Sequence, residues 1–103
     1  MPSIDFFRLR SQVSISQVLA LIDYAPTRQR GRQWRGPCPI HGSHSPKSRS
    51  FSINTERNIF RCFKCGAQGN QLDLWMAITD LPLYEATVDL CEKLSLDIPR
   101  QDA

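Results

Sequence analysis

Apolar side chains recur at helical spacing in the N-terminal part of the chain. Residues 15–24 repeat them at intervals of three and four positions, which predicts a short amphipathic helix. Ser14 and Gln17 stand at its start in the pattern of a capping box, and Pro26 marks its exit. An earlier turn or helix is expected over residues 4–9.

Two further helices are expected in the C-terminal third of the chain. Asn70 is suited to cap the first of them, with Asp73 at the favourable third position. Apolar residues over 72–78 give this helix a wide apolar face. A final helix is expected over 83–94. Its predicted apolar stripe consists of Tyr84, Val88 and Cys91.

Between the helices, the pattern changes to one typical of strands. Residues 51–53 and 59–62 alternate apolar with polar side chains, and the segment 54–58 between them has the composition of a turn. This pattern predicts a β-hairpin with Phe51 and Phe60 in its apolar phase. Both rings are therefore expected to belong to the core.

A second hairpin, rich in arginine, is expected before the first. Residues 28–34 form its basic strand, and glycine and proline punctuate the chain beyond it. Since strand side chains repeat every two residues, we expect Arg28, Arg30 and Arg32 to project from one face.

The middle segment also contains two pairs of residues suited to bind a metal ion. Cys38 and His41 are separated by two residues, and so are Cys62 and Cys65. Structural zinc takes four tetrahedral nitrogen or sulfur ligands, and thiolate with imidazole favours zinc over calcium or magnesium. The spacing therefore predicts one structural Zn²⁺ held by Cys38, His41, Cys62 and Cys65.

Other interpretations of these cysteines and histidines fit less well. His44 competes with His41, but the tight clip spacing favours His41. The N-terminus lacks a secretory signal, and no apolar run has the length of a membrane span. The expected compartment is therefore the reducing cytoplasm, where disulfides are disfavoured. A redox dithiol at Cys62 and Cys65 would need a thioredoxin-like context. A catalytic zinc would need an open position and a nearby base, and Glu56 is the one acid close in sequence.

Together these elements predict an α+β fold in a single domain over residues 1–103. Its centre is a small zinc ribbon over 27–66, an antiparallel sheet with two zinc knuckles. A helical N-terminal part over 1–26 and C-terminal helices over 67–103 flank it. A chain of this length buries a modest core, and a zinc site contributes roughly 10–16 kcal/mol of apparent binding energy.

The charge of the chain is concentrated in this ribbon. The net charge is +3, but residues 28–64 carry nine basic side chains and one acidic one, giving +8. The remainder carries four basic and nine acidic side chains, giving −5. So uneven a distribution indicates a nucleic-acid partner.

The order and spacing of these motifs resemble those of a known family. The chain is similar to the N-terminal zinc-binding domain of bacterial DnaG-type DNA primases, the Cys-His-Cys-Cys zinc ribbon. The resemblance is nearly end to end, and its most specific part is Cys-Phe-x-Cys-Gly-x-x-Gly-Asn over 62–70. The loop over 42–50 departs from the family, because it is longer than the compact Thr-Pro-Ser-Phe found there.

This resemblance implies a role in DNA replication. Such domains recognise single-stranded template at initiation sites and support RNA primer synthesis. The polymerising chemistry of the family belongs to a separate TOPRIM core, for which the chain has no room after Pro99, so it is not expected to be an enzyme by itself. The implied partners are single-stranded DNA and a primase catalytic core, helicase or other replication protein, with no membrane.

Surfaces that bind single strands combine a basic groove with aromatic faces on which bases stack. Phe63 and Lys64 lie inside the second clip, where a knuckle presents side chains outward. Trp34 is suited equally to packing and to stacking. The residues expected to contact nucleic acid are Arg28, Arg30, Arg32, Trp34, Arg35, Arg61, Phe63 and Lys64.

A protein-docking role is the alternative hypothesis. In that case the ribbon would be a stand-alone module for a polymerase, helicase or mobile-element protein, and the acidic C-terminal flank could meet a basic partner. Binding to a protein at high salt, without single-strand binding at low salt, would distinguish it.

Overall fold

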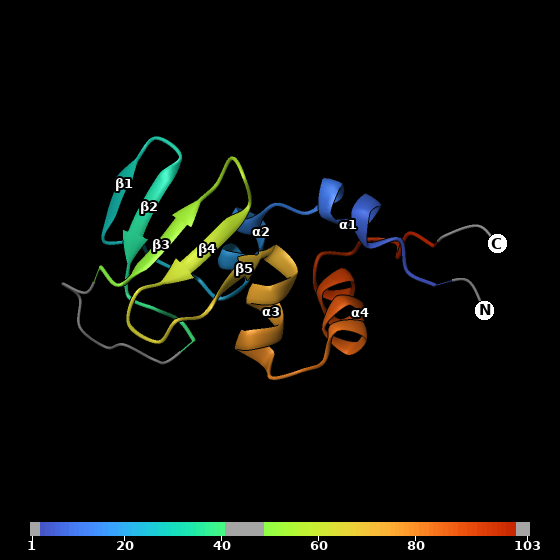
Figure 1. The fold of residues 1–103 in the computed structure, drawn as a ribbon. Helices are drawn as coiled ribbons and strands as arrows, with labels where there is room; N and C mark the ends of the chain where they lie inside the picture. The colour runs from blue at the N-terminus through green and yellow to red at the C-terminus, as the bar shows by residue number, and fades with distance from the viewer. Residues whose placement is uncertain (1–2, 41–48, 101–103) are drawn as a thin grey trace.

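The computed structural model describes residues 3–40 and 49–100. In this part of the chain, one antiparallel sheet lies at one end of the molecule and helices pack beside it (Figure 1). The strands follow one another in the sheet in chain order. The elements are α1 (Phe6–Gln12), α2 (Ile15–Leu21), β1 (Arg28–Arg30), β2 (Gln33–Gly36), β3 (Phe51–Asn54), β4 (Ile59–Cys62), β5 (Gln68–Asn70), α3 (Gln71–Thr79) and α4 (Leu83–Lys93).

Helix α2 begins at the predicted capping box. The backbone N–H of Ser14 donates to the Gln17 side chain at 2.8 Å, and the Ser14 hydroxyl accepts from the Gln17 N–H at 3.2 Å. This reciprocal pair satisfies N–H groups that have no partner inside the helix. Helix α1 begins at Phe6, where the Asp5 carboxylate accepts from the Arg8 N–H. It therefore lies slightly later than the segment expected from the sequence.

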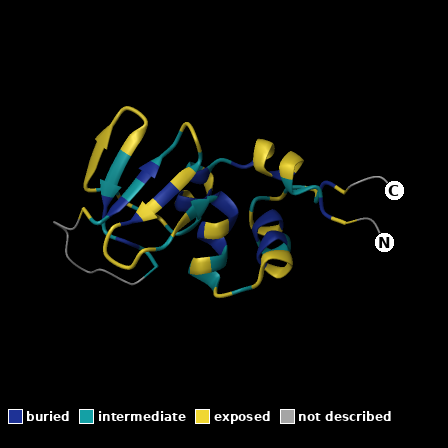
Figure 2. Ribbon diagram, in the orientation of Figure 1, coloured by how far each residue is buried: buried dark blue, intermediate teal, exposed yellow. Residues whose placement is uncertain are grey.

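The sheet separates apolar from polar side chains by strand alternation. Phe51, Ile53 and Phe60 lie on its inner face and are 0%, 0% and 4% exposed. The Phe51 and Phe60 rings are 5.5 Å apart, which confirms the prediction that both belong to the core. Figure 2 shows buried residues alternating with more exposed ones in β3 and β4, whereas the edge strand β1 is exposed throughout.

Strand β5 was not expected from the sequence. It pairs with β4 through Gly69, opposite Phe60, and through Gln68, opposite Arg61. Glycine and asparagine are depleted in strands, so a three-residue strand containing both gives no propensity signal. The neighbouring knuckle, which returns the chain beside β4, makes this strand possible.

Helix α3 begins directly at the end of β5. The Asn70 side chain accepts from the N–H groups of Leu72 and Asp73 at 2.9 and 3.0 Å, and Asp73 accepts from the Asn70 N–H at 2.9 Å. The predicted cap is therefore confirmed as a capping box. Because of this cap, the strand turns into the helix without an intervening loop.

The predicted apolar stripe of the last helix is wrong. Tyr84 is 52% exposed, whereas Thr87 and Leu90 are fully buried next to Cys91. The buried face of α4 is rotated from the predicted stripe because Thr87 can enter the core. The Thr87 hydroxyl donates to the Leu83 carbonyl at 2.7 Å. An internally satisfied hydroxyl is buried at little cost.

Side-chain and backbone bonds join the helical part to the rest. The Gln71 amide, 2% exposed, donates to the carbonyls of Arg10 and Val13 at 3.0 and 2.7 Å. The two ends of the described chain lie side by side (Figure 1), because the Asp5 N–H donates to the Pro99 carbonyl at 2.9 Å. Within the described ranges, no helix has the length and apolar character needed to cross a bilayer.

Candidate metal centre and nucleic-acid interface

The first cysteine of the metal centre follows strand β2. Cys38 is 1% exposed, and Pro37 before it accepts a 2.7 Å hydrogen bond from the Tyr24 hydroxyl. Gly36 allows the Tyr24 hydroxyl to come this close to the strand. A Cβ atom at position 36 would lie 2.6 Å from the Tyr24 oxygen and 3.0 Å from the Thr27 nitrogen. Strand β2 and the exit of α2 therefore fix the position of Cys38 together.

The other two cysteines occupy a tight turn after β4. The Gly66 N–H donates to the Cys62 carbonyl at 3.0 Å, and the Cys65 N–H donates to the Cys62 sulfur at 3.3 Å. Gly66 has φ +82°, a conformation that glycine adopts without a steric penalty. The turn therefore directs both sulfur atoms to the same side.

These two segments bring three thiols together. The sulfur atoms of Cys38, Cys62 and Cys65 all lie within 4.8 Å of one another, and Cys38 and Cys65 are 4.0 Å apart. Burial raises the pKa of Cys62, but hydrogen bonds from the Cys65 and Lys64 backbone and from the other two thiols outweigh burial and lower the pKa to about 6. A thiolate in such a cluster is the ligand that zinc requires.

The predicted fourth ligand, His41, and its competitor His44 lie outside the described residues. The three described sulfur atoms fit three positions of a tetrahedral site. Zn²⁺ held by these residues would have a structural role and would join the ends of β2 and β4. Cys91 is buried in α4, and burial raises its pKa, as expected for a structural thiol.

The outer face of the sheet collects the basic residues of the ribbon. Cross-strand partners in an antiparallel sheet point to the same face, so the register of the strands defines a row of neighbours that crosses all five of them. This row consists of Arg28, Arg35, Ser52, Arg61 and Gln68. Arg30 lies on the same face, two residues from Arg28. We call this surface, with Arg28, Arg30, Arg35 and Arg61, the arginine face.

Phe63 extends the arginine face with an exposed aromatic ring. It is 56% exposed, and the guanidinium carbons of Arg35 and Arg61 each lie 5.1 Å from its ring centroid. Both separations are within cation–π range. Arg35 is held in place because its Nε and Nη2 atoms donate to the Arg49 carbonyl at 3.1 and 2.6 Å. The knuckle therefore presents an exposed aromatic ring beside two cations, of which Arg35 is held in place.

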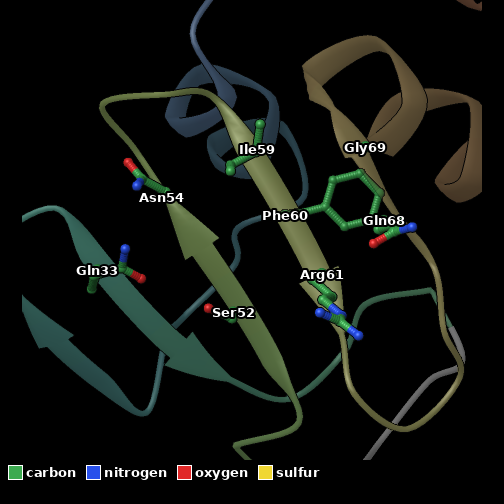
Figure 3. Close-up of a pocket in the computed structure, with 8 residues that line it drawn as sticks. All are labelled: Gln33, Ser52, Asn54, Ile59, Phe60, Arg61, Gln68 and Gly69. Carbon is green, nitrogen blue, oxygen red and sulfur yellow. The ribbon is translucent and has the colours of Figure 1, made fainter.

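A hollow of about 640 Å³ opens on the same face (Figure 3). Its volume falls within the range of about 300–1,000 Å³ that is common for small-ligand sites. Four neighbouring strands contribute to its lining, which combines apolar surface with amide, hydroxyl and guanidinium groups. We call it the amide hollow. Its polar lining residues are Gln33, Ser52, Asn54, Arg61 and Gln68.

Of the other three predicted contact residues, Trp34 and Arg32 do not follow the predicted arrangement. Trp34 pairs with Ile53 on the inner face and packs against the core, so it does not share the arginine face. Arg32 lies in the turn after β1, out of the expected strand alternation, and forms an ion pair with Glu56. Lys64 is exposed in the second clip.

Sequence reasoning missed the polar lining of the amide hollow. Gln33 and Asn54 alternate with the inner residues Trp34 and Ile53, so the two-residue period could have indicated their face. Gln68 gave no such signal, because β5 itself was not predicted. Uncharged amides also carry no charge pattern that would mark them as a site.

Comparison with known proteins identifies the family. The chain matches the CHC2 zinc finger family over residues 2–103, so it belongs to this family, the zinc-binding domain of DnaG-type primases. This result, with the observed sheet and cysteine cluster, confirms the suspected resemblance, the α+β fold and the single structural zinc.

Individual relatives are bacterial primases. The DNA primase of Geobacillus stearothermophilus is 38% identical over 90 residues, which is 87% of this chain and 14% of that protein. The DNA primase of Escherichia coli (strain K12) is 31% identical over 85 residues, which is 82% of this chain and 14% of that protein. The chain thus spans about one seventh of the length of these relatives.

A solved structure has the same fold. The crystal structure of the Aquifex aeolicus primase, comprising its zinc-binding and RNA polymerase domains, aligns with a TM-score of 0.70 at 26% identity. The alignment covers 100% of this chain and 23% of that one.

Proposed function

We propose that this chain is the zinc-dependent, single-stranded DNA recognition module of a DnaG-like primase and supports RNA primer initiation in DNA replication. The observation that carries this proposal is the exposed ring of Phe63 beside Arg35 and Arg61 on the arginine face. Single-strand binding surfaces combine cations for phosphates with aromatic rings on which bases stack.

Different side chains among the described residues would contact different parts of the DNA. Arg28, Arg30, Arg35 and Arg61 would attract the phosphate backbone, and the exposed ring of Phe63 would stack on a base. The amides of Gln33 and Gln68 carry both donors and acceptors, so a base in the amide hollow could be hydrogen-bonded along its edge. Single-stranded bases expose these edges to a protein.

The zinc ion has an indirect role in this proposal. Cys38 follows β2, while Cys62 ends β4, and the row of the arginine face crosses both strands. Metal binding would therefore hold Arg35 and Arg61 at the spacing that Phe63 needs. Removal of zinc would weaken DNA binding even though no ligand residue touches DNA.

The partners and location follow from the same family relationship. Primer synthesis would require a separate catalytic core, such as the RNA polymerase domain present in the Aquifex primase structure, together with a helicase or other replication protein. We place the chain in the cytoplasm, because free thiols persist in a reducing compartment.

Fluorescence anisotropy of labelled single-stranded DNA tests this function. Zinc-loaded protein should bind with an affinity that falls with salt, with a log–log slope of about −0.7 for each phosphate contacted, and chelator-stripped protein should bind weakly. Arg61→Ala should weaken binding and reduce the slope, while Lys93→Gln on α4 should do neither.

The opposite results would favour the docking hypothesis. If zinc-loaded protein does not bind single strands at low salt, or if its binding does not depend on salt, template recognition is wrong. A protein partner retained at high salt would then become the better explanation.

A further inference from the structure

A second hollow lies beside the arginine face, between α1, the β3–β4 turn and the start of α3. Its volume is about 360 Å³, at the lower end of small-ligand sites. We call it the α1 hollow. The side chains that bear on its chemistry are Phe7, Arg10, Arg57 and Ile59.

The α1 hollow presents an aromatic ring to solvent. Phe7 is 79% exposed, the most exposed large apolar side chain in the described part of the chain. A ring on the solvent side of a short helix contributes little to the core and leaves a stacking face free. Because its burial does not explain its presence, Phe7 is a candidate for contact with a ligand.

Two cations accompany this ring. Arg10 and Arg57 line the α1 hollow from opposite segments, and its lining within the described ranges includes no carboxylate. An aromatic ring with two guanidinium groups is the combination that binds a nucleotide, with a stacked base and neutralised phosphates. The charge therefore favours an anionic ligand.

The two hollows share one lining residue. Ile59 lines both of them and is 44% exposed. In the sheet it stands between Asn54 and Asn70 on the outer face. A strand bound across the arginine face can therefore pass over Ile59 into the α1 hollow without crossing the core.

Side-chain amides join the segments that line the α1 hollow to their neighbours. The Asn58 side chain accepts from the Ile15 N–H at 2.8 Å, which joins the β3–β4 turn to α2. Gln71 donates to the carbonyls of Arg10 and Val13, which joins α3 to the last turn of α1 and to the residue after it. Walls fixed in this way lose less entropy on binding a ligand.

We propose that the α1 hollow is a second nucleotide subsite on the path of the single strand. Phe7 stacks on a base there, and Arg10 and Arg57 contact the adjacent phosphates. This inference rests on the proposed function of the arginine face, and it extends the DNA footprint from the sheet to the N-terminal helix.

The test is a length series with zinc-loaded full chain and oligothymidylates of about 4 to about 16 nucleotides. Phe7→Ala should lower the affinity for the longest oligonucleotide by about fivefold or more, the effect of one lost stacking contact of at least about 1 kcal/mol. It should leave the shortest one, held by the arginine face, unchanged. Phe7→Tyr should retain the aromatic contact and the wild-type affinity.

The cations have a separate readout and a matched control. Arg10→Ala and Arg57→Ala should each reduce the magnitude of the salt slope for the longest oligonucleotide by about 0.7. Arg8→Ala on the same helix, outside the lining of the α1 hollow, should leave the slope unchanged. An equal loss in Arg8→Ala would show general attraction by α1 and would overturn the subsite.

The remaining outcomes separate the subsite from the proposed function. If Arg61→Ala weakens binding at every length while Phe7→Ala weakens it at none, the arginine face binds DNA and the α1 subsite is wrong. If the wild-type chain binds none of the oligonucleotides, both proposals are wrong. Circular dichroism of each variant checks that the fold is retained.

Discussion

The Tyr24 hydroxyl donates a 2.7 Å hydrogen bond to the Pro37 carbonyl, one residue before the zinc ligand Cys38. The Tyr24 ring also packs edge-on against Phe51, with centroids 5.8 Å apart. Burial, and then the nearby charge of Cys38, raise the pKa of Tyr24. The phenol therefore stays protonated and connects the core to the first zinc clip.

Tyr24→Phe should loosen this clip while leaving the core intact. The variant keeps the ring but leaves the Pro37 carbonyl without its donor, at a cost of about 1 kcal/mol. We expect zinc affinity to fall about fivefold in competition with a chromophoric chelator. Tyr84→Phe, at an exposed position on α4, is the matched control and should not differ from wild type.

Gly36→Ala should destabilise the same region by a steric route. The added Cβ would lie 2.6 Å from the Tyr24 oxygen and 3.0 Å from the Thr27 backbone nitrogen, so backbone must shift. Overpacking of this kind costs about 1–3 kcal/mol, measured as the free energy of unfolding in urea. Gln33→Ala, at an exposed position of the same strand, should change the free energy of unfolding by less than about 0.5 kcal/mol. A loss in Gln33→Ala equal to that in Gly36→Ala would contradict the steric explanation.

Side-chain patterns predicted those parts of the fold that depend on local chemistry. Ser14 and Asn70 mark their helix starts because a cap needs only residues a few positions apart. The face of α4 could not be read in this way, because Thr87 counts as polar until its bond to Leu83 is seen. Strand β5 depends on pairing with β4, which no local pattern of Gln68 and Gly69 encodes.

In the candidate site, too, local features could be predicted from the sequence and features that depend on tertiary packing could not. Clip spacing predicted that Cys38, Cys62 and Cys65 share one site, and the structure does place their sulfur atoms within 4.8 Å of one another. Strand alternation alone did not tell that Trp34 packs inward, since either face of a hairpin can be the buried one. Only the pairing of Trp34 with Ile53, and of Ile53 with Phe60, shows which face of β2 is buried.

The fourth zinc ligand remains a prediction from spacing. His41→Ala should lose zinc at near-stoichiometric chelator, because only three thiolates would remain, whereas His44→Ala should retain it. Zinc content after dialysis against chelator measures this directly. The reverse pattern would assign the fourth position to His44.

Gln71→Leu should destabilise the junction between α1 and α3. The substitution nearly conserves volume but removes the donor to the Arg10 and Val13 carbonyls, and Val13 is 1% exposed. The buried Val13 carbonyl left unpaired would cost about 1–3 kcal/mol, seen as a lower urea midpoint. Gln68→Leu, at an exposed position in β5, should leave the midpoint nearly unchanged.

Alanine substitutions of Phe63 and Trp34 should have opposite effects on stability and on DNA affinity, because the two rings lie on opposite sides of the sheet. Phe63→Ala removes a ring that is 56% exposed, so the free energy of unfolding should change little. Its affinity for single-stranded DNA should fall about fivefold or more, the effect of one lost stacking contact. Trp34→Ala removes a ring packed against the core and should cost about 1 kcal/mol or more of stability. Below its unfolding transition, it should bind DNA as wild type does. A loss of affinity in Trp34→Ala equal to that in Phe63→Ala would instead mean that the inner face takes part in binding.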